Sequence, residues 1–217
     1  MVETAELIDV RGKKITTYIL HEVVSAFSRI TQGESVELLT DDFEPIDGDV
    51  RAWCRMTGHR LAAVEREAGH QKFVIEKGDA HETRRKLTLV LSNTGLEELL
   101  SPLAFAMAAA LGGAQVFIYF QGPAVKVLAS GFKERLSGIG RPFSGFARRG
   151  LAKIGHEPPH EKLRQLQGLG ARLFACAGSM DHFGVKKEDF AFDDVTISEY
   201  VAFMELMEGA DIHIFLQ

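Results

Sequence analysis

Hydrophobic residues follow two different periods in the first third of the chain. Between residues 17 and 31 they recur every three or four positions, which predicts an amphipathic helix. Residues 61–67 and 71–77 instead alternate about Ala68-Gly69-His70, which is typical of a β-hairpin. Further strands are expected at residues 6–10 and 35–39. A second helix with Asp47 and Asp49 at its amino end is expected to stop at Gly58.

From residue 86 onward the pattern changes to short, nearly continuous apolar runs separated by helical segments. Such runs are typical of parallel strands buried on both faces. Strands are expected at residues 87–91, 115–120, 172–175 and 211–216, and helices at residues 97–111, 161–169 and 199–208, with Ser198 as the cap of the last. The pattern predicts a two-layer α/β sandwich (βαβαββ) followed by a doubly wound, mostly parallel, three-layer α/β/α domain.

Polar residues 78–84 lie between the two patterns and favour a linker. We therefore expect one domain at residues 1–78, a linker at 79–85 and a second domain at 86–217. Residues 126–159 exceed the length of a simple crossover and are interpreted as an inserted loop, rich in glycine and basic residues, with interleaved phenylalanines. This insertion is expected to pack on its own domain or on a neighbouring subunit. Contact with an anionic membrane surface is the weaker alternative.

One uncharged stretch, residues 99–120, is long enough to suggest a membrane span. It is alanine-rich in its first half and β-branched and aromatic in its second, with Gly112 and Gly113 between them. A helix, a glycine stop and a buried strand explain that change better than one spanning helix.

Charge and cysteine content narrow the classes of function. The net charge is −5, with no basic surface typical of nucleic-acid binding. Residues 1–82 carry a net charge of −6 and the remainder +1, so the acidity belongs to the first domain. The chain has two cysteines and no apolar leader, which favours a cytoplasmic protein with free thiols.

Cys176 is the strongest candidate for chemistry. It follows Ala171-Arg-Leu-Phe-Ala175, where a parallel strand is expected to end and a helix to begin. The carboxyl ends of parallel strands gather ligands, and nearby helix N–H groups lower a thiol pKa. A cysteine also packs readily at the end of a buried strand, and on the residues alone this structural interpretation is preferred.

The first domain resembles TusA-like (SirA-like) sulfur carriers. The matching stretches are Leu7-Ile-Asp-Val-Arg-Gly12, Gly33-Glu-Ser-Val-Glu-Leu-Leu-Thr-Asp-Asp42 and Trp53-Cys-Arg-Met-Thr-Gly-His59. The reactive CPxP motif of that family is replaced here by Ile15-Thr-Thr-Tyr18. The resemblance therefore implies the fold without sulfur chemistry at that position. Cys54 shares a helical face with Trp53 and is expected to be core.

The second domain resembles the DsrE/DsrF-like family, in particular its longer, peroxiredoxin-like branch. The matching residues are Ala175-Cys-Ala-Gly-Ser-Met-Asp-His-Phe-Gly-Val-Lys-Lys-Glu188 and the terminal Asp211-Ile-His-Ile-Phe-Leu216. The resemblance implies that Cys176 carries sulfane sulfur as a persulfide, as in a sulfurtransferase, and that the chain forms multimers. Some relatives have a second cysteine where Ser179 stands here, so a two-cysteine relay is not expected.

Polar residues after the predicted strands are expected to line the pocket of Cys176. They are Asn93, Thr94, Gln121 and Ser179. Sulfur donor and acceptor proteins and a second copy of the chain are the expected partners, with no nucleic acid. An assembly or regulatory module that uses both domains as docking surfaces is the alternative, and a small-ligand binder at the same strand ends is a third.

No cofactor or metal is expected. His156 and His160 are four residues apart, but Pro158 and Pro159 between them disfavour a helical metal face. Solvated or hydrogen-bonded histidines are the preferred interpretation, and convergence with Cys176 and His182 is the alternative.

Overall fold

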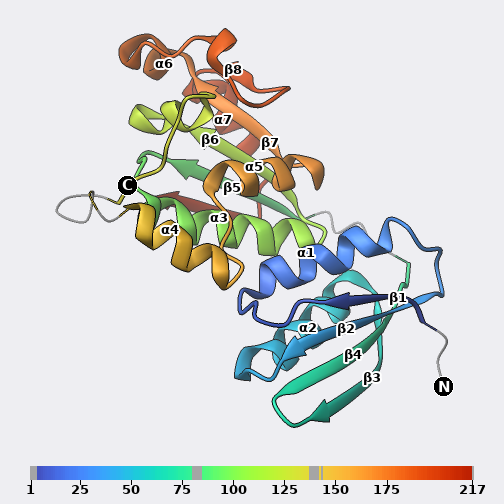
Figure 1. Ribbon diagram of the computed structural model, residues 1–217. Coiled ribbons are helices and arrows are strands. Elements are labelled where there is room, and N and C mark those ends of the chain that lie inside the picture. Colours follow the sequence, from blue (N-terminus) through green and yellow to red (C-terminus); the bar gives the residue numbers. More distant parts are fainter. Residues whose placement is uncertain (1–3, 80–84, 137–141, 143, 217) are drawn as a thin grey trace. The chain divides into compact units, whose positions relative to one another are not determined.

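The computed structural model describes residues 4–79, 85–136, 142 and 144–216 (Figure 1). The chain divides into two compact units. The first contains residues 1–83 with the short segments 111–113 and 149–157, and the second contains the rest. Residues 80–84 of the expected linker lie outside the described residues, so the linker remains a prediction.

The first unit has the expected order of strands and helices. Its elements are β1 (Thr4–Asp9), α1 (Thr16–Phe27), β2 (Ser35–Asp41), α2 (Glu44–Thr57), β3 (Arg60–Glu67) and β4 (His70–Glu76). The strands lie in the order β1-β2-β4-β3, with β1 parallel to β2 and the other pairs antiparallel. Alternate residues of β2, Val36 and Leu38, are fully buried, and so is Ile19 of α1. Helices on one face of an open sheet give the two-layer arrangement.

The second unit alternates strands and helices. Its elements are β5 (Lys86–Leu91), α3 (Leu96–Leu111), β6 (Gln115–Phe120), the 3-10 helix η1 (Gly122–Leu128), the first half of α4 (Ser144–Lys153), α5 (Pro159–Gly168), β7 (Arg172–Cys176), α6 (Ala177–Phe183), the 3-10 helix η3 (Lys187–Asp189), β8 (Thr196–Ser198), α7 (Tyr200–Met207) and β9 (Ile212–Leu216). The last residue of α3 and the second half of α4 belong to the first unit. The five strands are all parallel and lie in the order β8-β7-β6-β5-β9.

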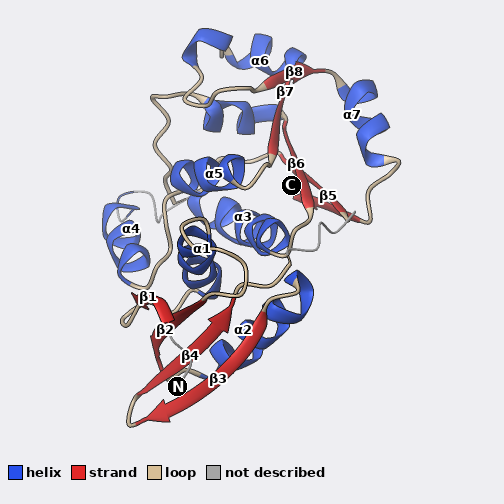
Figure 2. Ribbon diagram, turned by 90° about the vertical axis from the view of Figure 1, so that its right-hand side faces the viewer, coloured by secondary structure: helices blue, strands red, loops and turns tan. Residues whose placement is uncertain are grey.

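Helices cover both faces of this sheet: α3 and α5 lie on one face and α7 on the other (Figures 1 and 2). The predicted α/β class with a parallel second sheet is therefore confirmed. The uncharged stretch 99–120 is divided as expected, because α3 ends at Leu111 and β6 begins at Gln115. Gly113 between them has a φ of 84°, which favours glycine. Among the described residues, no helix is long and apolar enough to cross a membrane.

Three expectations about helices were wrong. Helix α1 ends at Phe27 rather than near residue 31, because the Arg29 N–H bonds to the Ala26 carbonyl in a tightened final turn. Ser198 does not cap α7, since it belongs to β8 and the N-cap is Glu199. Residues 126–159 are not one long loop, because they contain α4, whose Gly145 and Gly150 concealed its helical pattern.

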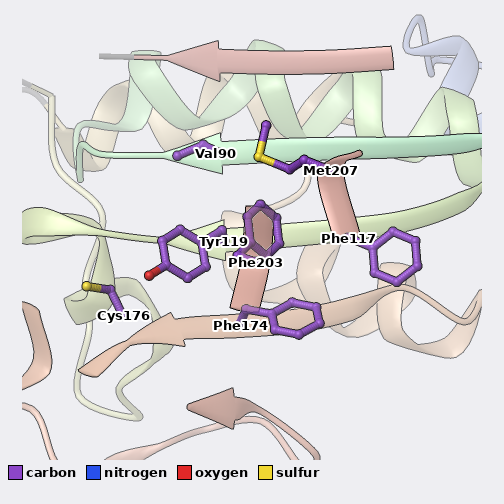
Figure 3. Packing of buried hydrophobic residues seen from close by; sticks show 7 residues of the cluster. All are labelled: Val90, Phe117, Tyr119, Phe174, Cys176, Phe203 and Met207. Atoms are coloured by element: carbon purple, nitrogen blue, oxygen red, sulfur yellow. The ribbon is translucent and has the colours of Figure 1, made fainter. Parts of the chain in front are cut away.

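One apolar cluster joins the second sheet to α7 (Figure 3). It takes alternate residues from the three central strands, so that one face of the sheet supplies them: Val90, Phe117, Tyr119, Phe174 and Cys176. Phe203 and Met207 of α7 complete it. The Phe203 ring stacks on Tyr119 at a centroid distance of 4.6 Å. The cluster therefore fixes α7 over the ends of β6 and β7.

Substitution Phe203→Ala tests this packing. The side chain is 2% exposed, so its loss should destabilise the second unit by about 3–5 kcal/mol. Val201→Ala on the same helix is the control, because Val201 is 83% exposed and should change stability by less than about 0.5 kcal/mol. Circular dichroism in a urea titration measures the difference. An equal effect of the two substitutions would contradict the assigned packing.

Candidate functional site

Three parallel strands end side by side at one edge of the second sheet. They are β5 at Leu91, β6 at Phe120 and β7 at Cys176. The residues that follow are joined across the strands, because the Gln121 amide donates to the Ser92 hydroxyl at 2.9 Å and the Gly122 N–H donates to Ser179 Oγ at 2.8 Å. This edge is where open α/β sheets bind ligands.

Cys176 is the last residue of β7 and the N-cap of α6. Its side chain lies on the same sheet face as that of Phe174, two residues earlier, and this face is covered by α7. The hydroxyl of Tyr119 points toward it in Figure 3. The sulfur therefore lies where β6, β7 and the amino ends of α6 and α7 meet.

Opposing effects act on the Cys176 pKa. Burial raises it, because a thiolate is poorly solvated inside the protein. Hydrogen bonds from the Ser179, Tyr119 and Tyr200 hydroxyls, together with the Ser179 N–H, favour the thiolate. Of these, the Tyr119 hydroxyl also has the Ser198 carbonyl as an acceptor, at 3.4 Å. The net result is a pKa below the usual value for cysteine. Correspondingly, the pKa of Tyr200 is raised, first by its hydrogen bond to Cys176.

Glu199 links the thiol to the start of α6. Its Oε1 accepts the Gly178 N–H at 2.8 Å, and the Cys176 thiol lies 4.0 Å from Oε2 as a donor. In the protonated state the sulfur thus has an acceptor, while in the thiolate state it has hydroxyl donors. The site contains both partners that a thiol needs to lose its proton and remain ionised.

Two small residues, Ala177 and Gly178, follow Cys176, but they do not leave it exposed to solvent. Cys176 is only 1% exposed. The polypeptide turns directly into α6, and the Glu199 carboxylate covers the backbone at Gly178. A molecule in solution therefore contacts Sγ only when these covering groups move.

The predicted pocket residues fall into two places. Gln121 and Ser179 belong to the hydrogen-bonded row at the strand ends. Asn93 and Thr94 line a separate cavity of about 630 Å³, together with Lys126, Lys133 and other residues. Cys176 is not among the described residues that line this cavity. The role of each of the four residues in ligand binding remains a prediction.

Cys54 has the opposite environment from Cys176. It is 4% exposed on the inner face of α2, and burial raises its pKa to about 11, although Arg51 and Arg55 oppose the shift. At the position of the family's CPxP motif, Ile15 forms the N-cap of α1 without a capping side chain. The first unit thus brings no thiol to that helix start.

The histidines have ordinary structural partners. His160 bonds to the Val127 carbonyl and packs against Phe132 and Phe192. His182 packs on the ring of Phe183. In the part of the chain that the structure describes, no group of three or more His, Cys, Asp or Glu side chains is arranged to hold a metal ion.

Sequence reasoning missed Tyr119, Glu199 and Tyr200 as members of the site. The two-residue alternation of β6 could have placed Tyr119 on the inner face near the strand end. Glu199 and Tyr200 are more than twenty residues beyond Cys176, and they come near it only because β8 returns the chain beside β7. No local spacing in the sequence indicates that return.

Two family models match this chain, one in each of its two predicted domains. The model described as DsrE/DsrF-like family matches residues 85–216. The chain belongs to the DsrE/DsrF-like family. A second model, described as Sulfurtransferase TusA, matches residues 20–77. This DsrE-like protein thus carries a TusA-like domain before its family domain, as the sequence predicted.

A solved structure similar to this DsrE-like protein is that of the ychN protein from E.coli. The identity is 17% and the TM-score is 0.46, and the match covers 62% of this chain and 100% of that one. Comparison with curated proteins gives no significant match. Both matching families belong to sulfur relay, so the two-domain chain has a general role in that chemistry.

Two substitutions should shift the Cys176 pKa in opposite directions. Tyr119→Phe removes a hydroxyl donor to the thiolate and should raise the pKa, at the same ring volume. Glu199→Gln keeps an acceptor for the Gly178 N–H but removes a negative charge near the sulfur, and should lower the pKa.

The measurement is the ultraviolet absorbance of the thiolate as a function of pH, in a Cys54→Ser background so that one thiol titrates. Tyr18→Phe is the control for loss of a tyrosine hydroxyl and should leave the curve unchanged. Shifts of the same sign in the Tyr119 and Glu199 variants would contradict the assigned contacts.

Proposed function

We propose that this protein relays sulfane sulfur as a persulfide on Cys176. The observation that carries the proposal is a strand-end thiol whose pKa is lowered, in spite of burial, by three converging hydroxyl groups. A persulfide sulfur is also anionic near neutral pH, so the same donors suit the loaded form. The family's general role in sulfur relay supports this chemistry.

The transfer step is a thiol–persulfide exchange. The Cys176 thiolate attacks the outer sulfur of a donor R–S–SH; the donor S–S bond breaks, and its electron pair leaves on the thiolate R–S⁻. The product is Cys176–S–SH, and no external oxidant or reductant is required. In the second half, an acceptor thiolate attacks the outer sulfur and the electron pair returns to Cys176.

Glu199 and the hydroxyl groups have separate roles in this proposal. Glu199 Oε2 takes the proton when the Cys176 thiol ionises, since it is the acceptor of that thiol. Ser179, Tyr119 and Tyr200 stabilise the charge on sulfur. Because Ser179 replaces the second cysteine of some relatives, sulfur passes to an external thiol and not to a neighbouring one in the same loop.

A docking module is the alternative function, and one observation favours it. The α7 side chains Tyr200, Val201 and Met204 are 55%, 83% and 53% exposed, and the first of them interacts with the buried Cys176. An exposed apolar surface of this kind suits a protein partner or a second copy of the chain. On this alternative, both domains bind partners and Cys176 serves packing alone.

Loading with sulfane sulfur distinguishes the two functions. Incubation with glutathione persulfide, followed by intact-mass and peptide mass spectrometry, should add one sulfur atom at Cys176. Cys176→Ser should abolish the addition, while Cys54→Ser should retain it, because Cys54 is buried with a raised pKa. Circular dichroism shows that each variant is folded. Absence of uptake by the folded wild type, under conditions that load a known carrier, would overturn the relay and leave the docking alternative.

A further inference from the structure

A second feature at the same sheet edge has no role in the exchange chemistry above. It is the cavity of about 630 Å³ at the carboxyl end of β5. The described residues that line it are predominantly polar or basic: Asn93, Thr94, Gly95, Glu98, Lys126, Gly131, Phe132, Lys133, Arg135 and Leu136. This volume lies within the range of small-molecule sites in proteins.

The walls of the cavity are fixed by backbone contacts. Gly95 and Arg135 form a parallel β-bridge, and the Leu96 N–H donates to the Arg135 carbonyl at 2.9 Å. The next residue, Leu136, donates its N–H to the buried Ser144 hydroxyl at 2.9 Å. The backbone at Arg135 is therefore tied to the turn after β5, and its side chain contributes to the cavity without being needed for these contacts.

The charge of the cavity favours an anion. Among the described lining residues, Lys126, Lys133 and Arg135 contribute three positive charges, against the single carboxylate of Glu98. That carboxylate already accepts the Gly95 N–H at 3.1 Å. Two positive charges remain in excess, and Asn93 and Thr94 add neutral hydrogen-bonding groups. Acidic groups of a ligand would be neutralised and hydrogen-bonded here.

The cavity and Cys176 lie at the same edge of the sheet. Strands β5 and β7 are separated only by β6, so their carboxyl ends are about 10 Å apart at the usual strand spacing. A small molecule in which a terminal carboxylate and a sulfur are separated by several bonds spans this distance.

We propose that the cavity binds a carboxylate of a small anionic thiol. Resting on the function proposed above, it also binds the persulfide of that thiol, which then acts as a sulfur donor to Cys176. Lys133 and Arg135 hold a terminal carboxylate, and the sulfur-bearing part of the molecule extends along the strand ends toward Cys176. The substrate class is thus a low-molecular-mass persulfide that carries carboxylates, in addition to protein-bound donors.

Binding of S-methylglutathione tests the cavity separately from any sulfur transfer. This probe has two carboxylates and a blocked sulfur that cannot react. Isothermal titration calorimetry should detect binding by the wild type. The double substitution Lys133→Gln and Arg135→Gln should weaken it at least about tenfold, because two charge-assisted hydrogen bonds are lost. The dimethyl ester of the probe, which lacks the carboxylate charges, should bind weakly to both proteins.

A matched control removes two positive charges at the opposite edge of the sheet. Lys86 and Arg172 are the first residues of β5 and β7. Lys86→Gln with Arg172→Gln should leave S-methylglutathione binding within twofold of the wild type. Equal loss in the two double variants would assign the effect to net charge and overturn the site, as would equal binding of the probe and its ester.

Transfer kinetics test the link to Cys176. In single-turnover loading with glutathione persulfide, the Lys133/Arg135 double variant should need about tenfold more donor for half-maximal rate, with a maximal rate within twofold, whereas the dimethyl ester of that persulfide should give the same half-saturating concentration (apparent KM) with both proteins. An unchanged KM would overturn the donor assignment while the relay stands. If no donor loads Cys176 but S-methylglutathione binds as described, the relay fails and the anion site stands.

Discussion

Parallel pairing of β6 with β7 is the constraint on which the candidate site depends. It brings the last residues of both strands to one edge, and their two-residue alternation places Tyr119 and Cys176 on the same face. Helix α7 then covers that face through Phe203. A shift of either strand by one residue would turn the thiol away from the tyrosine hydroxyl, so the electrostatics of the sulfur follow from sheet register.

Much of the fold follows from local patterns, because strands buried on both faces and amphipathic helices have distinct periods. The runs that became β5, β6 and β7 were visible in this way, as was Cys176 at the junction of strand and helix. The short β8 and the helix α4 were not visible. β8 has three residues, too few for a period, and the glycines of α4 resemble those of a loop.

The site was only partly predictable, because local patterns locate strand ends but not residues that distant parts of the chain bring to them. Gln121 and Ser179 lie just after strand ends, where polar residues in a parallel sheet indicate a ligand site. Glu199 and Tyr200 reach the thiol through a return of the chain that depends on tertiary pairing, and no sequence spacing records it. Burial of Cys176 was also missed, since small neighbours such as Gly178 suggest openness, whereas the covering carboxylate comes from a distant residue.

Burial of a thiol with a lowered pKa also controls how readily oxidants react with it. Oxidation to sulfenic and sulfinic acids requires both thiolate character and contact with peroxide. Cys176 has the first property but, at 1% exposure, lacks the second. Contact with peroxide therefore requires the covering groups to move. On the relay proposed above, a sulfur donor depends on the same movement, but a donor that binds to the protein remains nearby through many such openings. A closed site of this kind would favour molecules with a long residence time over small, freely diffusing oxidants.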